Sequence, residues 1–213
     1  MFPLLKPGLC ALYAKFAGKV EELALVYVNL AIERELCWMA DWMEHGNGIL
    51  LYRSLDFSPS TAGVVVGYTD ASSSGMGIWF PEDGFACRSV LPMAPPTDTI
   101  FYFEALAVCS AIHTVADMDP VPPRLLIYTD NTNTVAMFNT LRAQPAYNAI
   151  LVSAVNILLQ YSVDLRVEHI AGKLNSVADA LSRFQDERVL ALAPGIDILT
   201  FEPPQDALGA APQ

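Results

Sequence analysis

The tripeptide Tyr-Thr-Asp occurs twice in this chain, each time after a short apolar run rich in β-branched residues. Residues 64–68 lead through a threonine into Asp70, and residues 125–128 lead in the same way into Asp130. Such runs are typical of strands buried on both faces of a sheet. Each run places a carboxylate at a strand's carboxyl end, where α/β sheets hold ligands. Two neighbouring aspartates repel unless a proton or cation lies between them, so the pattern indicates a metal site.

Two further acids are candidates for the same site. Glu104 lies in a predicted helix, and the residues three and four positions away from it are apolar. A glutamate in a buried stripe is costly unless it is paired or binds a cation. Asp179 lies in the first turn of a predicted helix that begins at residue 176, where the helix dipole favours an acid.

Each acid, taken singly, also has an ordinary structural explanation. Asp70 fits a turn, Asp130 fits a helix N-cap, Glu104 fits a salt bridge, and Asp179 fits the helix dipole. Their joint occurrence in one βα order favours a shared site over four separate explanations.

The composition limits the classes of partner. The chain has 12 Lys and Arg against 23 Asp and Glu, a net charge of −11. Tight unspecific binding to nucleic acid usually needs a basic face, although bound metal ions can supply positive charge locally. The four cysteines are scattered without a CxxC pair, which indicates reduced thiols and an intracellular protein, cytoplasmic or nuclear. We expect no membrane span and no signal peptide.

The chain divides into three predicted parts. Residues 1–61 form a helical segment, with helices expected over 21–32 and 33–44. Residues 62–183 follow the order βββ-α-β-α-α-β-α, which predicts a mixed α/β domain. Residues 184–213 are rich in Pro, Ala and Gly, and we expect a poorly ordered tail.

The motifs in the second part resemble type 1 ribonuclease H domains, in particular those of retrotransposon reverse transcriptases. Four features carry the likeness: residues 68–72, Glu104 inside a helix, residues 128–131, and residues 169–183. The last stretch contains Gly-Lys-x-Asn-x-x-Ala-Asp-x-Leu-Ser-Arg, a retroelement hallmark. Residues 1–60 resemble, more weakly, the connection between the polymerase and ribonuclease H parts of retroelements that use a tyrosine recombinase.

The resemblance implies a fold, an activity and a site. The fold is a five-stranded mixed sheet with helices on both faces, preceded by the small helical segment. The activity is hydrolysis of the RNA strand of RNA–DNA hybrids, with the RNA 2′-hydroxyl as the discriminator. The family's catalytic, metal-binding carboxylates correspond to Asp70, Glu104, Asp130 and Asp179. They would hold two Mg²⁺ ions, with Mn²⁺ as a substitute.

Some residues depart from the family pattern and keep alternatives open. Many cellular members have a histidine where this chain has Ile170, and the adjacent His169 points to the other face of its strand. The chain has no Tyr/Phe-x-Asp-Asp polymerase motif, so a separate polymerase or recombinase part of the retroelement is a possible partner. One alternative is an inactive or repurposed retroelement remnant that only binds nucleic acid or protein. Another is a different nuclease or transposase of the same fold family.

Overall fold

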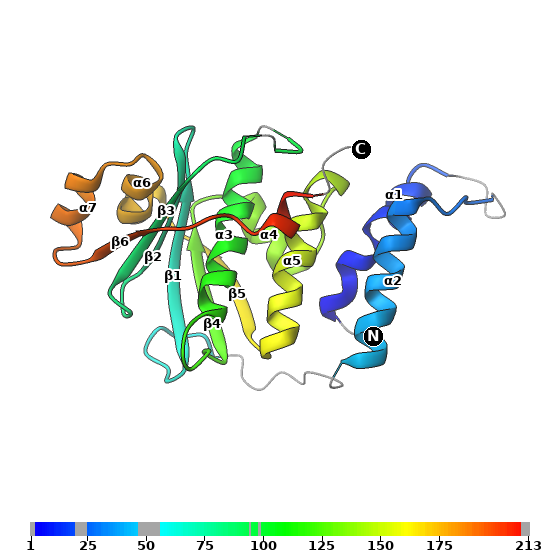
Figure 1. Cartoon of the computed structure of the whole chain (residues 1–213), viewed down its shortest axis with the longest axis horizontal. Coiled ribbons are helices and arrows are strands. Elements are labelled where there is room, and N and C mark those ends of the chain that lie inside the picture. The colour runs from blue at the N-terminus through cyan, green and yellow to red at the C-terminus, as the bar shows by residue number, and fades with distance from the viewer. Residues whose placement is uncertain (1–2, 20–24, 47–55, 94, 98, 210–213) are drawn as a thin grey trace.

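The computed structural model describes residues 3–19, 25–46, 56–93, 95–97 and 99–209. Its centre is a six-stranded mixed sheet with the strand order β5-β4-β1-β2-β3-β6 (Figure 1). Strands β1 to β3 form an antiparallel meander, and β4, β5 and β6 then pair in parallel with β1, β4 and β3. The strands are β1 (Val64–Ala71), β2 (Gly75–Phe80), β3 (Phe85–Val90), β4 (Arg124–Thr129), β5 (Asp164–His169) and β6 (Asp197–Thr200).

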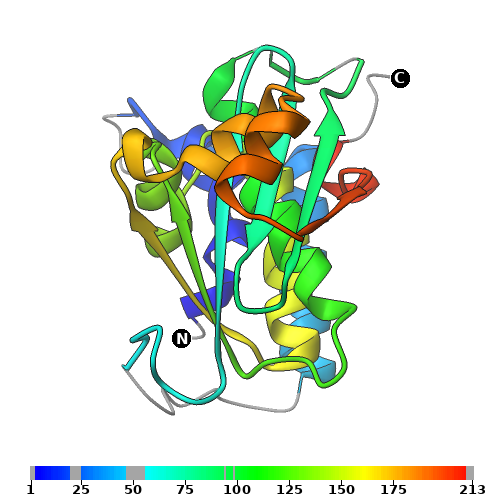
Figure 2. The same cartoon turned by 90° about the vertical axis from the view of Figure 1, so that its left-hand side faces the viewer.

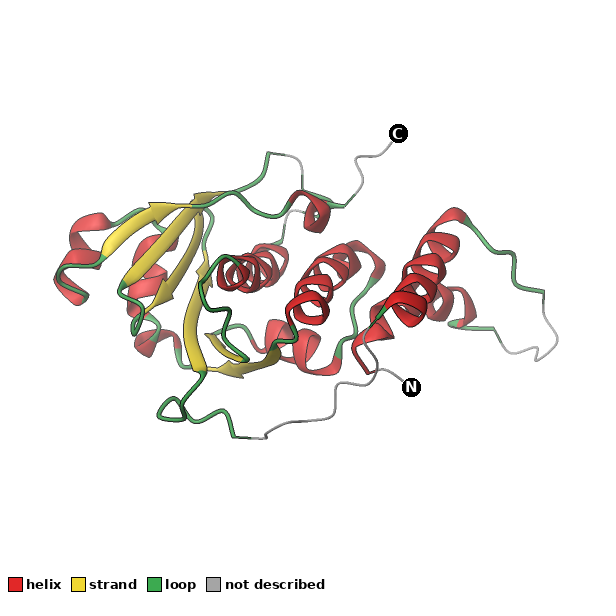
Figure 3. Cartoon of the chain, turned by 60° about the horizontal axis from the view of Figure 1, so that its bottom comes forward, coloured by secondary structure: helices red, strands yellow, loops and turns green. Residues whose placement is uncertain are grey.

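Helices cover both faces of the sheet. Helices α3 and α5 lie on one face, and α6 and α7 lie on the other (Figures 1 and 3). The α-helices are α1 (Cys10–Phe16), α2 (Leu30–His45), α3 (Ile100–Ala116), α4 (Thr132–Thr140), α5 (Pro145–Tyr161), α6 (Ser176–Ser182) and α7 (Asp186–Leu192). Three 3-10 helices accompany them: η1 (Pro3–Leu9), η2 (Gly172–Leu174) and η3 (Gln205–Leu208).

Helix α3 is the central helix of the core. It begins where the Thr99 side chain accepts a hydrogen bond from the backbone N–H of Tyr102, an N-cap that satisfies an otherwise unpaired donor. Its sequence is apolar almost all round, as expected for a helix enclosed between a sheet and another helix. Tyr102, Leu106 and Ile112 are among its fully buried side chains. This burial fixes the rotation of α3 and therefore the position of every side chain on it.

The predicted fold class is confirmed, and the strand count is corrected. The sheet is mixed, carries helices on both faces, follows a helical segment, and shows the predicted order of elements from β1 to α6. It has six strands, however, and not the five expected.

The sixth strand comes from the segment that we expected to be a poorly ordered tail. Residues 184–209 instead contain α7, β6 and η3. β6 pairs in parallel with β3, whose edge would otherwise present unpaired backbone groups. The side chain of Asp206 accepts a hydrogen bond from Ser153 on α5. The sequence analysis missed β6 because the strand is short, lies in a Pro- and Ala-rich segment, and pairs with a strand more than a hundred residues earlier in the chain. Residues 210–213 lie outside the described part.

The N-terminal helices lie against the outer side of α5. The indole N–H groups of Trp38 and Trp42 both donate to Asn156 Oδ1, at 2.7 and 3.0 Å. Asn148 Nδ2 donates to the carboxylate of Glu35 at 2.8 Å. The expected helix over 21–32 is wrong for residues 25–29, which are not helical, whereas residues 30–32 belong to α2; residues 21–24 lie outside the described part. α2 starts only after Asn29, whose side chain caps it.

No helix in the described part of the chain has the length and apolar character needed to cross a membrane.

Candidate metal centre

The two strand-end aspartates lie side by side because β1 and β4 are parallel neighbours. Tyr68 is directly opposite Tyr128 in the register of these strands. Asp70 and Asp130 each lie two residues further along, so they reach the same edge of the sheet. Asp70 is the seventh residue of β1, whereas Asp130 follows the last residue of β4.

Glu104 reaches this edge from α3. Its Oε1 accepts a hydrogen bond from the backbone N–H of Ala71 at 3.2 Å, and its Oε2 accepts one from Thr129 Oγ1 at 3.2 Å. The carboxylate is thus held between the ends of β1 and β4. Because both partners are part of the sheet, the orientation of the Glu104 side chain is fixed.

Three of the four predicted acids form one cluster. Asp70, Glu104 and Asp130 each offer a carboxylate oxygen, and these oxygens all lie within 4.8 Å of one another. Asp70 is 5% exposed and Glu104 is 3% exposed, whereas Asp130 is more exposed than either. The cluster is buried at its back and accessible at Asp130.

Burial, and after it the proximity of other acids, raises the pKa values of the two buried carboxyl groups in the cluster. Burial, followed by the charge of Asp70, raises the pKa of Glu104 to about 8. Burial also raises the pKa of Asp70 to about 6, although a 2.7 Å hydrogen bond from Ser182 Oγ opposes the rise. At neutral pH these groups cannot all be charged unless a cation joins them.

The donor set fits a divalent cation. Carboxylate oxygens are the ligands that hard cations such as Mg²⁺ and Mn²⁺ prefer. The backbone also leaves little space beside Asp130, because a Cβ added to Gly172 would lie 2.8 Å from Asp130 Oδ2. We conclude that Asp70, Glu104 and Asp130 could bind a divalent metal ion.

Asp179 lies outside this three-acid cluster. Arg183 Nε donates to its Oδ1 at 2.6 Å, and Arg188 Nη1 donates to its Oδ2 at 2.8 Å. Burial alone would raise the pKa of Asp179, but the two arginines bring it below its usual value. Asp179 is still close enough for its charge to contribute to the raised pKa of Asp70. Of the four acids expected to converge, Asp70, Glu104 and Asp130 lie together and Asp179 lies apart; their role as catalytic metal ligands stays a prediction.

Several supporting residues were missed by the sequence analysis. Ser182 donates to Asp70, and Thr129 donates to Glu104. Gly77 allows α6 to approach β2, since a Cβ there would lie 2.5 Å from the carbonyl oxygen of Ala178. Ser182 and Thr129 could have been found from the sequence, because they lie inside the Leu-Ser-Arg motif and the second Tyr-Thr-Asp. Arg188 could not, because it lies in the segment that we expected to be poorly ordered.

The register of β4 and β5 gives the positions of His169 and Ile170 relative to Thr129. His169 is exposed at the end of β5, opposite Thr129 in the register. The backbone N–H of the next residue, Ile170, donates to Thr129 O.

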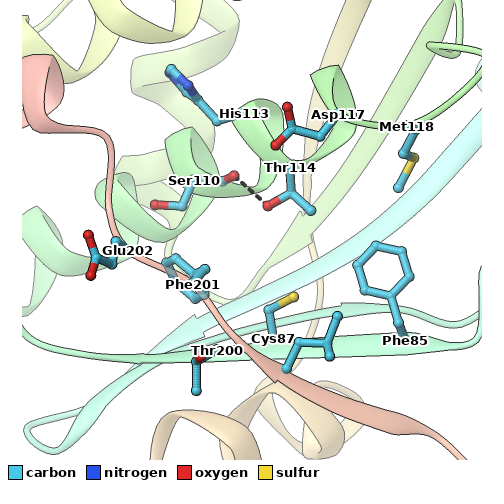
Figure 4. Close-up of a pocket in the computed structure, with 11 residues that line it drawn as sticks. Phe85, Cys87, Ser110, His113, Thr114, Asp117, Met118, Thr200, Phe201 and Glu202 are labelled. Atoms are coloured by element: carbon cyan, nitrogen blue, oxygen red, sulfur yellow. Dashed lines mark hydrogen bonds between the residues drawn. The ribbon is translucent and has the colours of Figure 1, made fainter.

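A separate pocket lies at the other end of α3 (Figure 4). Its volume is about 510 Å³, and its walls come from β3, the carboxyl end of α3 with the residues after it, β6 and the segment after β6. His113 lines it from α3, Asp117 from the C-cap of that helix, and Glu202 from the C-terminal segment. The α3 residues that line the pocket begin at Ser110, beyond Glu104 towards the carboxyl end of the helix, and none of the three clustered acids lines it.

Comparisons with known proteins give structural similarity only. No protein-family model matches the chain, and no curated protein does. RNase H1 from the halophilic archaeon Halobacterium salinarum NRC-1 is 19% identical with a TM-score of 0.48, over 58% of this chain and 98% of that one.

Two further solved structures are similar to this chain at the same level. LC11-RNase H1, solved in complex with an RNA/DNA hybrid, is 18% identical with a TM-score of 0.47, over 55% of this chain and 92% of that one. An N-terminal RNase H domain from Mycobacterium tuberculosis is 15% identical with a TM-score of 0.46, over 61% of this chain and 99% of that one.

Proposed function

We propose that this chain is a metal-dependent endonuclease that hydrolyses the RNA strand of RNA–DNA hybrids. The observation that carries the proposal is the convergence of Asp70, Glu104 and Asp130 from three separate elements into one cluster. The motifs around these acids are those that resemble type 1 ribonuclease H domains. We further propose Asp179 as the fourth catalytic carboxylate, at the rim of the cluster.

The acids would hold two Mg²⁺ ions, for which Mn²⁺ could substitute. When bound, such ions activate a water molecule and stabilise the charge on the leaving oxygen. Glu104 is already oriented by Ala71 and Thr129, and Asp70 by Ser182. Such outer partners hold ligands in place before the metal arrives. Asp130, the most open of the three, lies where a substrate strand could approach.

The wider setting is also a proposal. Residues 172–183 carry the retroelement pattern, and residues 1–61 resemble a reverse transcriptase connection. We therefore propose a retroelement reverse transcriptase fragment without polymerase, with a boundary between the helical segment and the sheet domain at 61/62, that acts inside the cell. A polymerase or recombinase part of the element would be its protein partner.

Specific observations favour a second candidate, an inactive or repurposed remnant. The net charge is −11, Ile170 replaces the histidine of many cellular relatives, and both oxygens of Asp179 are engaged by arginines. Such a remnant would keep the fold but only bind a partner.

Cleavage of a labelled hybrid separates these candidates. Purified protein with Mg²⁺ is expected to cut the RNA of an RNA–DNA hybrid and to leave duplex DNA intact. Asp70→Asn should abolish the cut, whereas Asp83→Asn, an exposed control in the β2–β3 turn, should keep it. Equal cutting by the wild type and Asp70→Asn would indicate a contaminating nuclease and favour the remnant. Cleavage of duplex DNA in place of the hybrid would favour a different nuclease.

A further inference from the structure

Three arginines lie where α6, α7 and β3 meet, together with acidic residues of α6 and α7. Figure 2 shows α6 and α7 in orange over the sheet. Arg88, Arg183 and Arg188 lie in this region, in a chain with only 12 Lys and Arg residues. Arg88 is paired with Asp186, and its guanidinium lies 5.0 Å from the centre of the Phe184 ring. The other two arginines have a different arrangement.

Arg183 and Arg188 share a single acid. Both donate to Asp179, one to each carboxylate oxygen. Arg188 also donates to Gln185, which carries no charge. Within the trio of Asp179, Arg183 and Arg188, two positive charges therefore face one negative charge. Asp186 and Glu187 lie in the first turn of α7, and Asp186 is paired with Arg88. The side chains of Arg183 and Arg188 are 49% and 45% exposed, so they are accessible from solvent.

The two guanidinium groups retain donors for another ligand. An arginine has five N–H donors in a planar fork. Within the described residues, Arg183 uses only its Nε, and Arg188 uses only its Nη1. The remaining N–H groups suit a phosphate, because arginine can donate to two phosphate oxygens at once.

Arg183 lies beside the three-acid cluster, because the residue before it, Ser182, donates from Oγ to Asp70 Oδ2 at 2.7 Å. In keeping with this, the charge of Arg183 partly offsets the effect of burial on the pKa of Asp70. Asp70 in turn contributes to the raised pKa of Arg183, after the larger effect of Asp179. A phosphate held by Arg183 would therefore lie next to the acids.

Arg188 is placed by packing. It lies on α7, whose Val189 is fully buried against Ala180 and Leu181 of α6. The backbone N–H of Gln185 donates to Ala180 O at 2.9 Å. α7 lies beyond the stretch that resembles ribonuclease H domains, so Arg188 is a contribution of the C-terminal segment of this chain.

We propose that Arg183 and Arg188 form a phosphate-binding pair that holds a backbone phosphate of the hybrid next to the three-acid cluster. This inference rests on the proposed function. Substrate phosphates and clustered carboxylates repel each other, so a cationic group at the rim lowers the cost of bringing a strand close. Phosphate contacts of this kind fix the position of a strand without reading its sequence.

The test compares Arg183→Gln and Arg188→Gln with Arg166→Gln. Arg166 is a matched control, because it is 40% exposed and lies on β5 near Glu168. Each of the first two variants is expected to raise KM about tenfold, with little change in kcat. Each should also reduce the slope of log affinity against log salt by about one. Affinity is measured in an Asp70→Asn background, so that the hybrid is not cut. The control should change neither quantity.

Arg188→Lys keeps the positive charge but removes the planar guanidinium group and its paired N–H donors. It is expected to keep the salt slope and to raise KM less than Arg188→Gln does. A fall in kcat with KM and salt slope unchanged would overturn the proposal, because the arginines would then only position Asp179.

Failure of the proposed function gives a different result. Wild-type protein that binds the hybrid without cutting it would contradict the nuclease assignment. The salt slopes of the variants would still show whether Arg183 and Arg188 bind a phosphate of the hybrid. Wild-type protein that does not bind the hybrid would contradict both.

Discussion

Replacing Glu104 with glutamine tests the electrostatics of the site without changing its shape. A glutamine can keep both hydrogen bonds, because its amide oxygen can accept from Ala71 N–H and its amide nitrogen can donate to Thr129 Oγ1. The change removes only the negative charge of a side chain that is 3% exposed.

The size of the change in the free energy of unfolding follows from the pKa of Glu104. The ordinary pKa of a glutamate is 4.5, and burial beside Asp70 raises that of Glu104 to about 8. In EDTA the folded protein therefore holds a proton that the unfolded chain releases over this range. The contribution to stability is complete below pH 4.5 and is lost as the pH rises towards 8. At about 1.4 kcal/mol for each pKa unit, the upper limit is about 5 kcal/mol. We expect about 2 to 3 kcal/mol, because Asp70 and Glu104 titrate as a coupled pair.

The assay is chemical unfolding at several pH values. In EDTA, Glu104→Gln should match the wild type near pH 4.5 and become more stable than it as the pH rises to 8.5. Glu82→Gln, an exposed control in the β2–β3 turn, should follow the wild type throughout. With Mg²⁺ in hundredfold excess over its Kd, the wild type should gain about 2.7 kcal/mol and Glu104→Gln clearly less. Parallel pH curves in EDTA for wild type and Glu104→Gln would show that Glu104 does not have a raised pKa in the folded protein. Equal stabilisation of both proteins by Mg²⁺ would show that Glu104 is not a metal ligand.

Other predictions concern the elements around the site. Asn156→Ala removes the acceptor shared by Trp38 and Trp42, which should cost about 1 to 2 kcal/mol and shift tryptophan fluorescence to the red; an unchanged spectrum would contradict the observed docking of α2 on α5. Gly77→Ala places a methyl group against Ala178 O, which should lower stability by about 1 to 3 kcal/mol and reduce hybrid cleavage, since α6 must move; full cleavage at wild-type stability would contradict this. A chain that ends before β6 exposes the edge of β3, so light scattering should show aggregation.

The strands and the first three acids could be predicted because the signals are local. An apolar run of four to five residues followed by Asp70 or Asp130 defines both a strand and its end. Glu104 was visible because a charge inside an apolar helix needs an explanation. Parallel pairing of β1 and β4 then brings the acids together without further information.

The rest depended on contacts that are distant in the sequence. β6 is a four-residue strand that pairs with the edge of β3, and its Ile198 packs against the cluster formed with α6 and α7. The sequence around Asp179 shows an acid at a helix start, but not that Arg183 and Arg188 both bind it. Arg188 lies nine residues further along and reaches Asp179 because α7 packs on α6. A motif therefore identified the acid, whereas its environment required the fold.

The most direct test of the account is a crystal structure of the protein soaked with Mn²⁺, in which anomalous scattering locates the metal. We expect anomalous peaks within coordination distance of Asp70, Glu104 and Asp130, and their loss in Asp70→Asn. Mn²⁺ bound elsewhere, with no peak among these three carboxylates, would contradict the proposed metal site.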